Sequence, residues 1–216
     1  MEGKVKKFLV VLSIMGLILT FAPQQTQAAI TMFDSRSLWE AAVGAFGTVD
    51  IASQLAELAI LSAGTPLTAA PGSITFSTDL QSLQVPSSWG TWSGGNIPAV
   101  LYTMGATSLT GTFSGLGPQA FGLEMEPNVM QIFNMTLLLS DGSILTQAVD
   151  GYGGAKFFGW AGDQSIQSMT LSLDGYSDFA FGRMVYGEGR VVPEPASLSL
   201  LGMGLLGLFG LKRKKT

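Results

Sequence analysis

The sequence predicts a mainly β protein: an antiparallel β-sandwich or jelly-roll domain with one or two short N-terminal helices. Three observations predict it. The body of the chain is rich in Gly, Ser and Thr, with turn signals at short intervals. Its apolar segments are short, and several alternate with the period of two that is typical of strands. No long helical segments separate them, which favours antiparallel pairing. Residues 30–190, about 160 in number, fit one domain.

Helices are expected at the start of this body. A capping box begins the first helix, with Ser37 as N-cap and Glu40 reaching back to its amide. Leu38 and Trp39 then lie on its apolar side, and Trp39 is assigned to the core. The apolar segment 54–61 is a candidate second helix.

Strands are expected over the rest of the body. The strongest hairpin signal is Asp141-Gly142, which lies between two apolar runs. The nine predicted strands cover residues 73–78, 99–102, 109–113, 120–125, 135–139, 144–149, 155–160, 166–173 and 179–186.

Charge is distributed unevenly along the chain. Residues 30–190 hold four basic and thirteen acidic residues, a net charge of −9, whereas the whole chain carries −4. The acidic body disfavours nucleic acid as a partner, because that affinity comes mainly from neutralising phosphates. The basic residues at both ends suit the cytoplasmic flanks of membrane-crossing segments.

The chain has no cysteine and no histidine. This excludes disulfides, cysteine-rich zinc sites, cysteine nucleophiles and Ser-His or Cys-His catalytic pairs. We predict no cofactor, no metal site and no catalytic residue. A calcium site is kept as an alternative, since four aspartates lie in predicted turns where hard cations find oxygen ligands. They are Asp141, Asp150, Asp163 and Asp174.

The N-terminus has the three parts of a secretory signal peptide, predicted here over residues 1–29. Lysines at positions 4, 6 and 7 precede the apolar run FLVVLSIMGLILTFA, and the small residues Thr26 and Ala28 follow at a plausible cleavage site. Cleavage by signal peptidase would start the mature chain near Ile30.

The C-terminus, residues 191–216, combines three features in order. A Val192-Pro193-Glu194-Pro195 motif comes first, an apolar helix rich in Leu and Gly follows, and a basic tail ends the chain. A helix from residue 196 to residue 211 would rise roughly 24 Å at about 1.5 Å per residue, short of a hydrocarbon core of about 30 Å. This suits a transient transmembrane helix with a stop-transfer tail. The tail residues are Lys212, Arg213, Lys214 and Lys215.

This arrangement resembles the PEP-CTERM sorting signal, a segment also classed with the C-terminal domain of ice-binding proteins. The resemblance implies Sec export, a membrane-anchored precursor, and cleavage by a membrane-embedded exosortase near the motif. Val192, Pro193, Glu194 and Pro195 would then be recognition residues of a substrate. It further implies delivery to the cell surface or the extracellular biofilm matrix of a Gram-negative bacterium. The body, including residues 157–187, resembles PEP-CTERM ectodomains and carbohydrate-module sandwiches more diffusely.

Two functions remain open for the body. The first is a non-enzymatic surface or matrix protein that associates with exopolysaccharide, with Trp89 and Trp92 as candidate glycan contacts in a Gly- and Ser-rich loop. Tyr102 and Trp160 are further aromatic candidates.

The alternative is a secreted glycan hydrolase using Glu124 and Glu126. Residues i and i+2 of a strand share a face, about 6.5–7 Å apart. Glycosidase carboxyl groups lie about 5–5.5 or 6.5–9.5 Å apart, so the spacing is compatible with catalysis. Two glutamates that leave a strand just before Pro127 are more often a solvated strand edge, and we predict a protein that is not an enzyme.

Overall fold

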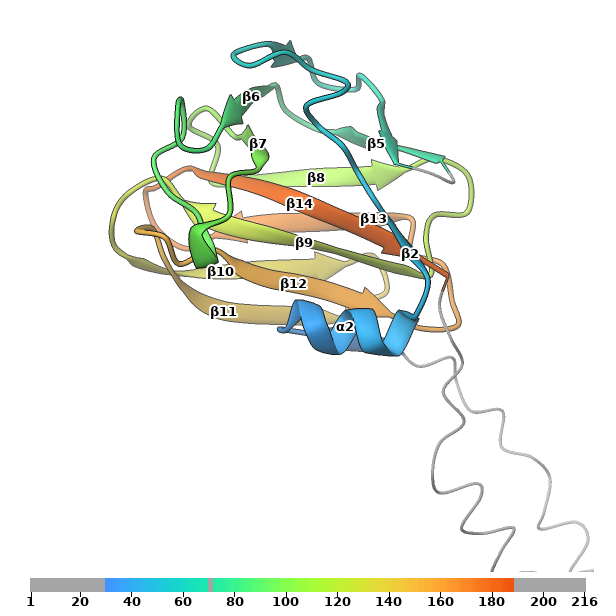
Figure 1. The fold of residues 1–216 in the computed structure, drawn as a ribbon. Helices are drawn as coiled ribbons and strands as arrows, with labels where there is room; N and C mark the ends of the chain where they lie inside the picture. The colour runs from blue at the N-terminus through green and yellow to red at the C-terminus, as the bar shows by residue number, and fades with distance from the viewer. Residues whose placement is uncertain (1–29, 70–71, 189–216) are drawn as a thin grey trace, which may run out of the picture.

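The computed structural model describes residues 30–69 and 72–188. Two antiparallel sheets pack face to face, which confirms the predicted sandwich (Figure 1). The predicted signal peptide and the predicted C-terminal sorting segment lie outside the described residues. Within the described part of the chain, no helix is long and apolar enough to cross a membrane.

The larger sheet has eight strands in the order β1-β12-β9-β14-β7-β6-β3, with β2 paired to β14. Every pairing in it is antiparallel. Its strands are β1 (Thr31–Phe33), β2 (Phe46–Thr48), β3 (Ile60–Leu61), β6 (Leu80–Gln84), β7 (Ala99–Tyr102), β9 (Ala120–Pro127), β12 (Lys156–Ala161) and β14 (Phe179–Gly187).

The smaller sheet has six strands in the order β11-β10-β13-β8-β5-β4, again all antiparallel. A hairpin at one edge of this sheet joins β10 and β11 through the predicted turn at Asp141-Gly142. Its strands are β4 (Leu67–Ala69), β5 (Gly72–Phe76), β8 (Ser108–Phe113), β10 (Ile132–Leu139), β11 (Ile144–Asp150) and β13 (Ser168–Leu173).

The core lies between the sheets and follows strand alternation. In β9, Phe121, Leu123 and Met125 point into it and are fully buried. The residues between them point to the outer face of the larger sheet. Trp160 of β12 also lies in the core, and its ring packs against the tilted ring of Phe121 at a centroid distance of 5.4 Å. A ring in this position is out of reach of a glycan, so the sequence-based suggestion for Trp160 was wrong.

One α-helix, α2 (Arg36–Val43), covers part of the outer face beside β12 (Figure 1). Trp39 is fully buried there, and its Nε1 donates to the Trp160 carbonyl at 2.8 Å. The predicted cap was wrong by two residues, because the N-cap is Ser35 and it makes no side-chain cap bond. Leu38 is 60 % exposed, since the helix buries only the stripe that contains Trp39.

The predicted second helix at residues 54–61 is not present. The segment makes turns and ends in β3. Leu58 has a φ of 67°, which a helix does not tolerate, and its amide donates to the carbonyl of Ser82 in β6. Tertiary pairing with β6 therefore overrides the apolar pattern.

Both ends of the described domain lie at one end of the larger sheet. Thr31 pairs with Ala161, Ala161 with Ala120, and Ala120 with Gly187. These four residues form a row across adjacent strands, so the chain enters and leaves about 14 Å apart, at about 4.8 Å per strand spacing.

Two glycines of the β8–β9 loop allow a matched stability test. Gly117 has a φ of +77°, and a Cβ there would overlap the backbone carbonyl of Ile166; Gly115 has a φ of +66° and open space. Gly115→Ala is expected to cost about 1–2 kcal/mol from backbone conformation alone. Gly117→Ala is expected to cost about 1–3 kcal/mol more, because the clashing atom is backbone. Denaturant unfolding measures both; equal losses would contradict this account.

Candidate functional site

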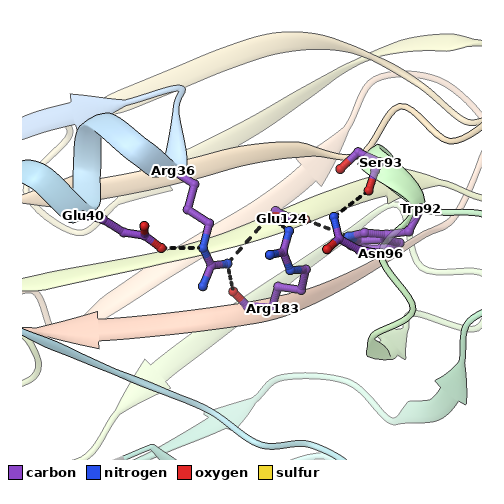
Figure 2. A network of polar contacts seen from close by, with 7 residues as sticks. All are labelled: Arg36, Glu40, Trp92, Ser93, Asn96, Glu124 and Arg183. Carbon is purple, nitrogen blue, oxygen red and sulfur yellow. Dashed lines mark hydrogen bonds and ion pairs between the residues drawn. The ribbon is translucent and has the colours of Figure 1, made fainter.

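The outer face of the larger sheet carries a polar network between α2 and the loop of residues 85–97 (Figure 2). Glu124 and Glu126 of β9 share this face, as the spacing predicts. They are not at a solvated edge, since β9 is an inner strand and the two residues are 4 % and 0 % exposed. The expectation of solvation was wrong because other elements cover the sheet.

Glu124 receives donors from three directions. Arg183 approaches its Oε1 through Nη1 at 2.6 Å, and Arg36 approaches the same oxygen through Nη1 at 3.6 Å. Trp92 donates its Nε1 to Oε2 at 2.7 Å. Figure 2 shows the two arginines on one side of Glu124 and Trp92 on the other. The buried carboxylate is thereby paired, which burial of a charge requires.

Local backbone geometry aims Arg183 at this site. The residue has a φ of 47°, and the register between β14 and β9 shifts between Gly182 and Val185. Such a bulge re-aims a side chain relative to a regular strand. The left-handed conformation costs energy for a residue with a Cβ, so the surrounding contacts must maintain it.

Arg36, the first residue of α2, ties the helix to the same point. Its Nε donates to Glu40 at 2.8 Å, and its Nη1 donates to the Arg183 backbone carbonyl at 2.9 Å. Glu40 therefore serves an ion pair with Arg36 and not the predicted capping box.

The loop of residues 85–97 covers the carboxyl groups. Besides Trp92, its Thr91 donates from Oγ1 to Glu126 Oε1 at 2.7 Å, and Trp89 packs on Tyr102 at 5.5 Å. Trp89 and Trp92 are 7 % and 4 % exposed. Their rings are thus packed over the sheet, which favours a structural role, and glycan contact through them stays a prediction.

Glu126 has a different environment from Glu124. Its Oε1 accepts from Thr91 and from the Gly153 amide at 3.2 Å, whereas its Oε2 is buried with no hydrogen-bond partner among the described residues. Burial raises the pKa of the Glu126 carboxyl, and the charge of Asp150 adds to this, against the lowering effect of the hydrogen bonds from Thr91 and nearby backbone amides.

A hollow of about 390 Å³ opens beside the network, between α2, β14 and the segment after β2. Arg36, Arg183 and Asp50 supply its charged lining, and Thr48 adds a hydroxyl. Sequence reasoning missed both arginines as site residues. Basic residues are rare in the acidic body, and this rarity could have marked the two arginines as candidates. Their contact could not be predicted from a local sequence pattern, because 147 positions separate them.

The aspartates considered for calcium make turn and loop contacts. Asp141 accepts from the Ser143 amide at 2.9 Å, and Asp174 accepts from the Asn134 amide at 2.7 Å. Among residues 30–69 and 72–188, no group of three or more acidic side chains is arranged to hold a metal ion.

Residues 191–214 match the family model described as the PEP-CTERM protein-sorting motif, which confirms that resemblance for this segment. A search of curated proteins finds no match for the chain.

Two solved structures illustrate what the chain is similar to. One is a family 29 carbohydrate-binding module, CBM29-2, with 10 % identity, a TM-score of 0.29, and coverage of 69 % of this chain and 99 % of that one. The other is CsCBM6-3 from Clostridium stercorarium in complex with cellobiose, with 12 % identity, a TM-score of 0.29, and coverage of 62 % and 95 %. These likenesses are too weak to indicate a shared function.

The environment of Glu126 predicts a pH-dependent stability. Its pKa is raised in the folded state, so the folded protein holds the proton more tightly than the unfolded chain. The contribution of this carboxyl group to the free energy of unfolding is therefore complete below the unfolded pKa of about 4.3. It is lost as pH rises through the higher pKa of the folded state. Glu126→Gln, which stays neutral, is expected to flatten that fall in Tm measured from about pH 4 to pH 8.

Glu57→Gln is the matched control for this pH series. Glu57 is exposed, and a hydrogen bond from Ser87 lowers its pKa, so its removal should leave the decline in place. Identical Tm profiles for the wild type and Glu126→Gln would contradict the assignment to Glu126.

The hydrolase alternative has its own test. Both carboxyl groups are closed off from solvent by the Trp92 loop, so a substrate would reach them only after that loop moved. We expect the wild type to release no reducing ends from polysaccharides. Reducing-end release by the wild type that disappears in a folded Glu124→Gln, Glu126→Gln double variant would instead establish the hydrolase.

Proposed function

We propose that this protein is exported, cut near its C-terminal motif by an exosortase, and delivered to the cell surface or extracellular matrix of a Gram-negative bacterium. The observation that carries the proposal is the match of residues 191–214 to the PEP-CTERM protein-sorting motif. In this role the chain is the substrate of a processing enzyme, and residues 192–195 are what that enzyme recognises.

Each part of the terminal segments has a distinct task in this proposal. Proline fixes φ and restricts the residue before it, so Pro193 and Pro195 would favour an extended segment around Glu194 when the exosortase binds. An extended segment is the conformation in which a protease can bind its substrate. The apolar run that follows halts export, and the basic residues 212–215 hold the tail on the cytoplasmic side.

The proposed processed protein runs from about residue 30 to the motif, after signal peptidase removes residues 1–29. The position of the domain's two ends supports this route. Thr31 and Gly187 lie in one row across the larger sheet, so both processed termini would leave the same end of the sandwich. The remaining surface would then face away from the membrane.

For the mature domain we propose association with exopolysaccharide and no enzymatic activity. The polar hollow beside Arg36 and Arg183 supports this, since it offers both donors and acceptors on an accessible face. The membrane is a transient partner during export, and nucleic acid is not a partner, given the acidic body.

Intact mass spectrometry of the protein recovered from its native host tests the sorting proposal. The wild type is expected to start near Ile30 and to end close to residues 193–195. Replacing Pro193, Glu194 and Pro195 together with alanine should leave a membrane-bound chain that keeps residues 198–216. A wild-type chain that keeps residues 198–216 would overturn the proposal.

A charge-matched pair sharpens the assignment to the motif. Glu194→Gln and Glu188→Gln remove the same charge six residues apart. Reduced cleavage is expected for Glu194→Gln alone, because Glu188 precedes the matched segment. Equal processing of the two variants would show that the exosortase does not recognise the Glu194 carboxylate.

A further inference from the structure

We propose that the hollow between α2 and β14 binds a carboxylate-bearing sugar, a hexuronate unit of an acidic polysaccharide, with Arg36 and Arg183 contacting its carboxylate. This inference rests on the proposed exopolysaccharide association and names its ligand class. It is independent of the sorting proposal, which concerns residues outside the described domain.

The placement of the cations is the first observation. Residues 30–69 and 72–188 contain three basic side chains, Arg36, Lys156 and Arg183. Two of them converge on one hollow although 147 positions separate them in the chain. Arg183 at 2.6 Å and Trp92 at 2.7 Å make the hydrogen bonds to the two oxygens of Glu124. The Arg36 guanidinium lies 3.6 Å from Glu124 and makes its ion pair with Glu40 at 2.8 Å through Nε.

Unused donors are the second observation. Arg183 engages Glu124 through Nη1, while Arg36 uses Nε and Nη1. In the described chain, no hydrogen bond involves Nη2 of either arginine or Nε of Arg183. The side chains keep 20 % and 30 % of their surface exposed, and both line the hollow. Guanidinium donors in a planar fork match a carboxylate.

The site is also held in place before a ligand arrives. Glu40 and Glu124 fix the Arg36 side chain, and the bulge with its φ of 47° fixes the backbone of Arg183. Ordering long side chains is a main cost of binding, so arginines that are already ordered favour affinity.

The rest of the lining favours a sugar over a simple anion. Asp50 and Thr48 supply acceptors for hydroxyl groups, and the volume of about 390 Å³ suits a small ligand. Arg36 and Arg183 are paired with Glu40 and Glu124, so the preference for a carboxylate comes from their unused donors and not from a net positive charge. The acidic body disfavours densely charged polyphosphates.

Calorimetric titration of the mature protein recovered from its host tests the site with three probes. They are trigalacturonate, its methyl ester, which blocks the carboxylates, and neutral maltotriose. We expect trigalacturonate to bind at least about tenfold more tightly than the ester, the difference expected for one charge-assisted contact. Equal affinity for the acid and the ester would overturn the proposal.

Variants at Ala52 change the hollow without touching the ion-pair network. Ala52 is exposed and lines the hollow, so Ala52→Glu and the uncharged control Ala52→Gln should both fold. The negative charge is expected to weaken trigalacturonate binding about tenfold relative to Ala52→Gln. Unchanged binding in Ala52→Glu would place the ligand elsewhere.

Arginine variants identify the contacts. Arg183→Lys keeps the positive charge but loses the planar guanidinium donors, so it should weaken trigalacturonate binding. Lys156→Gln removes a positive charge away from the hollow, so it should leave trigalacturonate binding unchanged. A pull-down with the host's own exopolysaccharide separates the two proposals. Retention that is equal in the wild type and Ala52→Glu leaves association standing and overturns this site. Absence of retention in the wild type overturns both.

Discussion

The buried carboxylate of Glu124 is the interaction on which the outer layer of the protein depends. A charge with 4 % exposure needs donors, and it takes them from three elements that are distant in sequence. They are Arg36 of α2, Trp92 of the covering loop and Arg183 of the bulge in β14. Helix, loop and bulge therefore meet at one group, and the hollow between the helix and β14 lies beside it.

Glu126 lies two positions along the same strand face and has a different environment. It receives neutral donors from Thr91 and Gly153, and its second oxygen has no partner in the described chain. Burial therefore raises its pKa, while the neighbouring Glu124 has a cation beside it. The loop of residues 85–97 contacts both carboxyl groups through adjacent residues, Thr91 and Trp92, and covers the network there. Arg36 and Arg183 line the open hollow on the other side of the network.

Much of the fold could be predicted because long strands carry a local signal. All nine predicted strands are present, and the Asp141-Gly142 turn joins β10 to β11 as expected. The short strands β1, β2, β3, β4 and β6 were not predicted. They carry little alternation of apolar and polar residues, and they exist because they pair with a neighbouring strand. The same pairing turned the apolar segment 54–61 away from a helix.

The sequence by itself determined the strand pattern, the shared face of Glu124 and Glu126, and the match of residues 191–214 to a sorting motif. These features are encoded over a few consecutive residues. Only the tertiary structure decided that both glutamates are buried, that the Trp89 and Trp92 loop covers them, and that Arg36 meets Arg183. The physical reason is distance along the chain: burial and charge pairing depend on which segments pack together, and residues 147 positions apart leave no local pattern that marks them as neighbours.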